Sequence, residues 1–233
     1  MTQALPTLLA TGDVSLQVLK RHHAEEYFTQ VEANREWLSR YFEWPDHCRS
    51  LEDAGDYLAR CAEQFASNQA WHFGIFVEDS LVGCIGLTPR AGLGIEMGAW
   101  LVQGAAGKGV ISKAGTLLIN FAFNRLHLPT LVARCQVANR PSRWVIGQLG
   151  FTSTGPIEQC EFRGEWVDCL SFALANPRVE AIWERRIEDM LHTLDDRIAL
   201  ELLESYVRSR DDQQAVQLAA AMDTYWQKVE ESS

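Results

Sequence analysis

The stretch from Trp100 to Ala114 reads WLVQGAAGKGVISKA, and it decides the expected fold. An apolar strand pattern leads into a turn of small residues, Gly104 to Gly109, and a helical pattern with Leu118, Phe121 and Ala122 on one face follows. The unpaired amides at the start of a helix favour negative charge, and glycines let a ligand approach the backbone closely. The pattern therefore predicts a phosphate-binding turn, although a strand–helix turn without a ligand is compatible with the same glycines.

The rest of the chain up to Pro177 alternates between strand and helix patterns. Short or alternating apolar runs predict strands, and apolar residues three or four apart predict helices. Pro45 is expected to end the first helix at or before Trp44, Asn139 to cap a later helix, and Gly150 to terminate it. Strands are predicted at 14–19, 71–77, 81–88, 95–102, 131–137, 157–162 and 166–174, and helices at 22–38, 53–68, after the glycine turn and at 139–149. This order indicates an α+β fold in which helices flank one sheet.

Composition places the chain among folded globular proteins. It has 233 residues, 47% of them hydrophobic, which suffices for one large domain or a domain with an appendage. No apolar run approaches the ~20 residues of a membrane helix, and the amino terminus lacks a signal-peptide pattern, so the cytoplasm is expected. The net charge of -10 argues against nucleic-acid binding and suits a cationic acceptor. The cysteines and histidines show no metal-ligand spacing, and the cysteines are expected to be reduced core thiols.

The pattern changes after Asn176-Pro177. No strand signal occurs from 178 to 233, and apolar residues such as Ile182, Ile187 and Leu191 recur at helical spacing. We therefore divide the chain into a domain at 1–177 and a helical extension at 178–233. Helices of this length are marginal alone, so we expect the extension to pack on the domain or to form a homodimer with a second copy.

Several motifs, in order, give the region before Pro177 a specific resemblance. They are Asn34 to Leu38 with Trp44-Pro45, Val82 to Leu87, Met97 to Leu101 with Gly107-Lys108-Gly109, Asn139 to Ser142, Leu149 to Phe151, and the hairpin Glu161 to Asp168. Together they resemble the GNAT acyltransferases, and more narrowly the Rim group, which acetylates N-terminal amines of ribosomal proteins. The resemblance implies a mixed, mostly antiparallel central sheet, acetyl-CoA as co-substrate, and direct attack by a primary amine in a ternary complex. The helical extension departs from that family's pattern.

The resemblance also implies which residues hold acetyl-CoA. A backbone amide near the end of the strand before the turn would stabilise the oxyanion, and the turn amides would hold the pyrophosphate. Two positions depart from the family's pattern, because Ala106 replaces an Arg or Gln and Ile111 replaces a Gly or Ala. The expected cofactor-binding residues are Trp100, Leu101, Val102, Gly107, Lys108, Gly109, Val110, Ile111, Ser112, Asn139 and Ser142.

Three residues are candidates for proton transfer. Glu161 matches the position of the family's proposed catalytic carboxylate and is the first candidate base, with Glu96 as the second. An N-terminal α-amine has a pKa of about 7.7–8.0, so a modest base suffices. No tyrosine lies between Cys135 and Phe151, where many related enzymes have their acid, and Ser142 stands in the matching turn. Ser142 is therefore the candidate acid. The alternative interpretations are that Glu161 is a surface residue of the hairpin and that Ser142 is only a polar residue in the first turn of a helix.

The aromatic segment before Pro45 covers the acceptor channel in the related enzymes. Tyr41, Glu43 and Trp44 are therefore the candidate acceptor wall, with core packing as the alternative for the aromatic residues, and His72 is a candidate channel residue. The predicted activity is N-acetylation of the primary amine at a protein N-terminus, and the N-terminus of a ribosomal protein is a candidate acceptor. The alternatives are a small amine acceptor, such as a polyamine, amino acid or aminoglycoside, and a non-catalytic acyl-CoA-binding interaction protein.

Overall fold

The computed structural model describes residues 5–91 and 93–178. The chain divides into two compact units, Met1–Pro177 and Arg178–Ser233, and the described residues belong, except for Arg178, to the first unit. The predicted helical extension, and the homodimer expected from it, lie outside the described residues. Within the described part of the chain, no helix is both long and apolar enough to cross a membrane.

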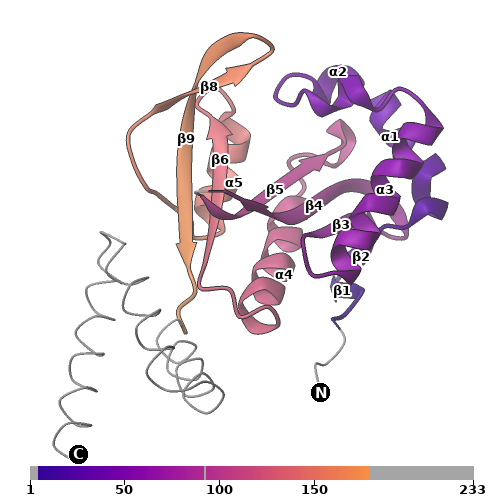
Figure 1. Cartoon of the computed structure of the whole chain (residues 1–233), viewed down its shortest axis with the longest axis horizontal. Coiled ribbons are helices and arrows are strands. Elements are labelled where there is room, and N and C mark those ends of the chain that lie inside the picture. Colours follow the sequence, from indigo (N-terminus) through magenta and orange to yellow (C-terminus); the bar gives the residue numbers. More distant parts are fainter. Residues whose placement is uncertain (1–4, 92, 179–233) are drawn as a thin grey trace, which may run out of the picture. The chain divides into compact units, whose positions relative to one another are not determined.

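One mixed sheet runs through the first unit (Figure 1). Its strands follow the order β1-β2-β3-β4-β5-β6-β9-β7, with β8 paired to β9. Among the described strand pairs only β5 with β6 is parallel, which confirms the predicted, mostly antiparallel sheet. The strands are β1 (Leu8–Thr11), β2 (Val14–Val18), β3 (Trp71–Val77), β4 (Ser80–Arg90), β5 (Gly94–Leu101), β6 (Thr130–Gln136), β7 (Thr152–Ser153), β8 (Glu158–Phe162) and β9 (Glu165–Ala175).

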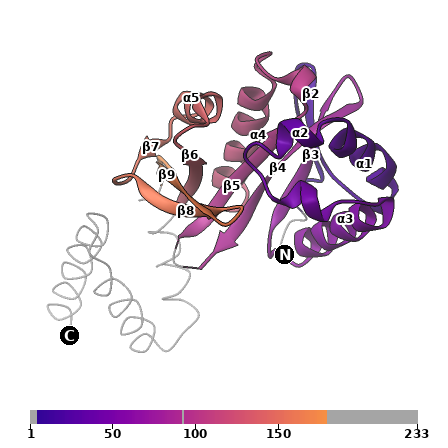
Figure 2. The same cartoon turned by 90° about the horizontal axis from the view of Figure 1, so that it is seen from above.

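Helices cover both faces of this sheet (Figures 1 and 2). One face carries α1 (Ala24–Ala33), α2 (Arg35–Leu38) and α3 (Leu51–Ala66), and the other carries α4 (Val110–Asn124) and α5 (Arg140–Gln148). Short 3₁₀ turns are η1 (Arg21–His23), η2 (Trp44–His47) and η3 (Gln103–Ala105). The predicted cap of α5 is confirmed, because the Asn139 side-chain oxygen accepts from the Ser142 N–H at 3.2 Å.

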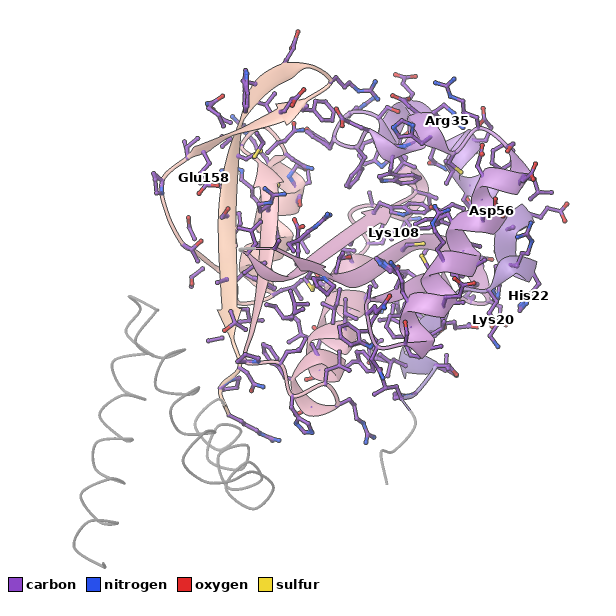
Figure 3. The ribbon with its side chains drawn as sticks, viewed as in Figure 1. Lys20, His22, Arg35, Asp56, Lys108 and Glu158 are labelled. Atoms are coloured by element: carbon purple, nitrogen blue, oxygen red, sulfur yellow. The ribbon has the colours of Figure 1, made fainter. Side chains whose placement is uncertain are left out.

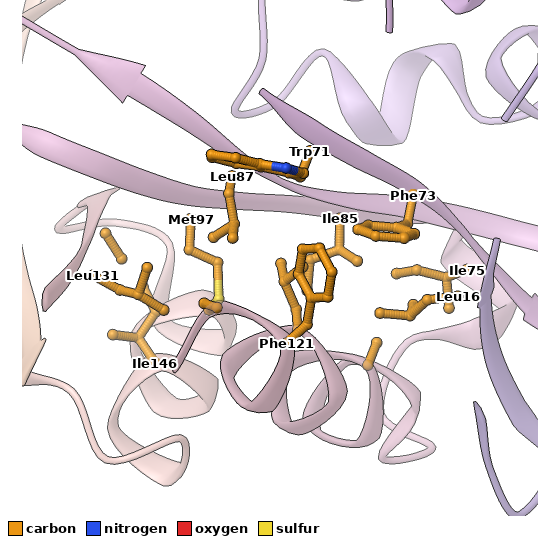
Figure 4. Close-up of a cluster of buried hydrophobic side chains, with 14 of the residues drawn as sticks. Leu16, Trp71, Phe73, Ile75, Ile85, Leu87, Met97, Phe121, Leu131 and Ile146 are labelled. Atoms are coloured by element: carbon orange, nitrogen blue, oxygen red, sulfur yellow. The ribbon is translucent and has the colours of Figure 1, made fainter. Parts of the chain in front are cut away.

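Two apolar cores fix the helices to the sheet. In the first, Phe121 on α4 meets Phe73 on β3 edge to face, with ring centroids 5.5 Å apart (Figure 4). In the second, beneath α1 and α3, the Trp100 ring on β5 lies 5.7 Å from that of Tyr27 and 5.5 Å from that of Trp44. Both cores include residues of β4 and β5, so the strands that bear the site are held from both sides.

Two predicted elements are wrong in detail. The helix predicted over 22–38 is broken at Asn34, whose side-chain oxygen accepts from the Gln103 N–H at 2.9 Å while its side-chain amide donates to the Gln30 carbonyl. Pro45 does not end a helix but occupies the first turn of η2, where its missing N–H is tolerated. The sequence analysis also missed β1, a short edge strand that pairs with β2.

Replacing Phe121 with Ala tests the first core. The change removes a buried ring and leaves a cavity, so we expect the free energy of unfolding to fall by about 3–5 kcal/mol. Denaturant unfolding of the full chain, followed by circular dichroism, measures the loss. Leu8→Ala is the control, because that side chain is 56% exposed and its loss should stay within about 0.5 kcal/mol. Equal losses in the two variants would contradict the packing described above.

Candidate active site

The parallel strands β5 and β6 pair at one position and then diverge (Figure 1). Glu96 opposes Val132, whereas β6 continues to pair with β9 from Thr130 to Gln136. The backbone groups on the facing edges of β5 and β6 beyond this point are left without a strand partner, and polar backbone groups need one. The divergence therefore opens a slot lined by hydrogen-bonding groups in the middle of the sheet.

Strand register decides which β5 amides face this slot. The Val102 N–H donates to the Val82 carbonyl at 2.9 Å, and its carbonyl accepts from the Ala105 N–H at 3.1 Å. Because antiparallel pairing alternates, the Trp100 amide also points to β4, and those of Ala99 and Leu101 point toward β6. Val102 and Trp100 therefore direct their amides into the β4–β5 ladder, and of the three predicted residues Leu101 has the amide that faces away from β4. The role of that amide as the oxyanion donor stays a prediction.

The glycine turn follows β5 and leads into α4. Gly107 and Gly109 have φ values of +75° and +74°, and a Cβ at either position would meet no atom within 4 Å. The first backbone bond of α4 is from the Lys113 N–H to the Gly109 carbonyl at 3.1 Å, so the preceding helix amides have no intrahelical partner. Lys108 is exposed on the turn (Figure 3). These unpaired amides form a site for an anion such as a pyrophosphate.

Ser142 lies beside the diverging end of β6. Its hydroxyl is close enough to Cys135, the buried thiol near the end of β6, to lower that thiol's pKa, although burial is the larger effect and raises the pKa overall. Cys135 therefore stays protonated at neutral pH and is a poor nucleophile. Asn139, which caps α5, lies in the same turn. The structure thus brings Asn139 and Ser142 to the β6 side of the slot, while the glycine turn lies at the end of β5.

Glu96, the second candidate base, is part of an ion-pair network. Its side chain is 15% exposed, and its two oxygens accept from Arg90 Nε at 2.7 Å and from Arg134 Nε at 3.4 Å. These ion pairs hold β4, β5 and β6 together where β5 and β6 meet, and the role of Glu96 as a base stays a prediction.

Glu161, the first candidate base, is exposed on the β8–β9 hairpin. It opposes Trp166, which is 71% exposed, whereas Cys160 and Phe162 lie on the opposite, partly buried face. The pleat therefore directs Glu161 to the more solvated face of the hairpin. Its role as the base remains a prediction.

The predicted acceptor residues have different environments. The Trp44 ring packs on the rings of Trp100 and Tyr27, as the alternative interpretation of core packing expected. The Tyr41 hydroxyl donates to the Ala138 carbonyl at 3.5 Å, across the slot. His72 is partly buried on β3, with its Nε2 3.5 Å from the Thr88 hydroxyl. Burial, and secondarily the Arg90 charge, lowers the pKa of His72.

The divergent pair of parallel strands, the unpaired strand amides and the unpaired amides at the start of α4 are the features expected of an acyltransferase that uses an acyl-CoA. The chain belongs to the GNAT acetyltransferase family, because the acetyltransferase (GNAT) domain matches residues 13–152. The chain is therefore an acetyltransferase.

Curated and solved proteins agree with this assignment. The ribosomal-protein-serine acetyltransferase of Escherichia coli (strain K12) is 28% identical over 164 residues, covering 70% of this chain and 92% of that protein. The microcin C7 self-immunity acetyltransferase MccE, solved with acetyl-CoA and AMP, has a TM-score of 0.69 at 19% identity, covering 74% of this chain and 98% of its own. RimL, a ribosomal L7/L12 alpha-N-protein acetyltransferase solved with coenzyme A, has a TM-score of 0.65 at 21% identity, with the same coverages. The solved structures confirm the fold.

The left-handed backbone at Gly109 gives a direct test of the anion site. An alanine at positive φ costs roughly 1–2 kcal/mol, so Gly109→Ala should displace the turn amides and raise the Kd for coenzyme A about tenfold. Isothermal titration calorimetry measures the change. Gly104→Ala is the matched control, because a Cβ there meets open space and its φ is not in the left-handed region. Equal affinities in the two variants would exclude this turn as the binding site.

Proposed function

We propose that the enzyme transfers the acetyl group of acetyl-CoA to the N-terminal α-amine of a protein, by direct attack in a ternary complex in the cytoplasm. The observation that carries the proposal is the slot between β5 and β6, which opens beside the glycine turn. The similarity to the E. coli ribosomal-protein-serine acetyltransferase, most of whose length the chain covers, supports a ribosomal protein as the acceptor.

The residues present fit acetyl-CoA. Unpaired amides of Ala99 and Leu101 border the slot, and the open glycines of the turn leave room for a pyrophosphate at the start of α4. When bound, acetyl-CoA supplies a thioester carbonyl that is reactive toward amines. The Leu101 or Ala99 amide would then stabilise negative charge on the carbonyl oxygen, and Ser142 would donate a proton toward the leaving sulfur.

Two glycines, one on β4 and one on β5, form a floor beside the slot. Gly86 and Gly98 oppose each other on β4 and β5, and a Cβ on Gly98 would meet no atom within 4 Å. The imidazole of His72 lies over Gly86, since a Cβ there would come within 2.4 Å of the His72 Nδ1. Thr88 and Glu96 continue the same face. An acceptor amine above Gly98 would thus lie one strand away from an imidazole.

His72 is our candidate for the group that removes the proton from the acceptor. Its lowered pKa keeps the imidazole neutral at pH 7, and a neutral imidazole accepts a proton. Both oxygens of Glu96 are engaged by guanidinium groups, and Glu161 lies on the solvated face of the hairpin. His72 therefore has the better position of the three and is in its proton-accepting form, acting directly or through one water.

Glutamine variants of the two candidate bases separate them. His72→Gln should reduce kcat/KM about 10²–10⁴-fold, the usual contribution of a general base, while Glu161→Gln should change it less than about twofold. In the wild type, activity should fall as pH drops through the lowered pKa of His72, below about 6.5, because protonation removes the acceptor lone pair. Protonation of the acceptor amine lowers activity in both enzymes, so His72→Gln should keep that fall and lose only the additional acidic ionisation that belongs to His72. A large loss confined to Glu161→Gln would return the role to the carboxylate predicted from the sequence.

The acceptor is tested by release of free coenzyme A thiol from acetyl-CoA. Peptides with the N-terminal sequences of ribosomal proteins should be acetylated at the α-amine, with kcat/KM at least about tenfold above that for polyamines, amino acids or aminoglycosides. Matched peptides with a blocked N-terminus control for acetylation of lysine. A preference for any of the small amines would overturn the protein acceptor and leave the acetyltransferase assignment in place.

A further inference from the structure

The segment 41–47, which follows α2 and contains η2, contacts elements on the far side of the slot, while α2 itself contacts the end of β5. We call this segment the arch. At its α2 end, the Trp37 Nε1 donates to the Leu101 carbonyl at 3.1 Å, so the helix that precedes the arch is bound to the end of β5. From α2, the Arg35 guanidinium donates to the Cys48 carbonyl at 2.7 Å and to the Pro45 carbonyl, so the later part of the arch is bound to the helix that precedes it.

The other side of the arch is bound to the strands beyond the slot. Tyr41 reaches the turn between β6 and α5 through Ala138, as described above. At the tip of the β8–β9 hairpin, the Arg163 N–H donates to the Glu43 carboxylate, and its guanidinium pairs with Asp46 Oδ2 at 2.8 Å. Figure 1 shows the hairpin tip and the segment after α2 approaching each other. The arch therefore spans from β5 to the far side of the slot.

Arg163 has a backbone conformation that suits this contact. Its φ is +53°, and that of the next residue, Gly164, is +79°, so the two residues form the tight turn of the hairpin. A non-glycine residue in the left-handed region is uncommon. At this position both the amide and the guanidinium of one residue bind the arch, 117 or more residues away in sequence.

We infer that Arg163 is a positioning residue for the acceptor, because its contacts with Glu43 and Asp46 fix the arch to the β8–β9 hairpin on the far side of the slot. The inference rests on the proposed function, since it concerns the acceptor of the same transfer.

A double-mutant cycle on the ion pair tests this role. Arg163→Asn removes the guanidinium but tolerates positive φ, and Asp46→Asn removes the partner charge. Each single variant should raise the KM for an N-terminal serine peptide about two- to fivefold, and the double variant should raise it no further. The KM for acetyl-CoA and kcat should stay unchanged. Arg163→Lys, which keeps the charge, should restore at least half of the lost affinity.

The Arg21–Asp56 ion pair supplies the matched control. Its N···O distance is 2.9 Å, and it joins η1 to α3. Its two side chains are more exposed than those of Arg163 and Asp46. Arg21→Asn and Asp56→Asn should leave the KM for the peptide unchanged. Additive effects at Arg163 and Asp46, or equal effects in the control pair, would overturn the inference.

Hydrogen exchange tests the contacts of Arg163 with Glu43 and Asp46, which we call the clasp, without any acceptor. Asp46→Asn should increase the amide exchange rate of hairpin residues 158–168 by at least twofold, and Arg163→Asn should do the same for residues 41–47. Unchanged exchange in both segments would show that Arg163 does not hold the arch. If the wild type acetylates no peptide, the proposed function fails, and the exchange measurement still decides whether the clasp exists.

Discussion

The structure depends on the divergence of two parallel strands from one paired position. The Glu96 carboxylate, held between Arg90 and Arg134, draws β4, β5 and β6 together at that end. Beyond it the strands separate, and their facing amides have no ladder partner. Backbone groups without a ladder partner take their hydrogen bonds from water or from a ligand, so this edge suits a ligand with amide and carbonyl groups of its own. The proposed binding site is thus a strand position that the fold leaves unfilled.

The same residues serve the core and the site with different atoms. The Trp100 ring fills the core beneath α1 while its backbone belongs to the β4–β5 ladder, and its neighbour Leu101 presents its backbone to the slot. Asn34 and Trp37 bind the η3 turn and the end of β5, so the cofactor-side backbone is also the support of the arch. We therefore expect a substitution in α2 to affect both the end of β5 and the arch.

The sequence predicts what depends on neighbouring residues and misses what depends on distant ones. The apolar run from Trp71 to Val77 located both ends of β3, and Asn139 revealed its own helix cap. The break at Asn34 depends on a hydrogen bond to Gln103, 69 positions away, which no helical pattern signals. The pairing of Glu96 with Arg134 and the orientation of Glu161 likewise depend on strand register. Arg163 was recognisable as a turn residue, but its contacts with the arch follow from tertiary structure alone.

Charge within the site bears on how an amine is recognised. The chain carries a net charge of -10, which attracts a cationic acceptor from a distance. Near the slot, however, Glu96 is paired with two arginines, and Glu43 and Asp46 are bound by Arg163. An ammonium group that reaches the floor above Gly98 therefore meets carboxylates that are already engaged, beside the neutral imidazole of His72. Such surroundings stabilise the ammonium form little, so they favour loss of the proton, and only the neutral amine can attack a thioester.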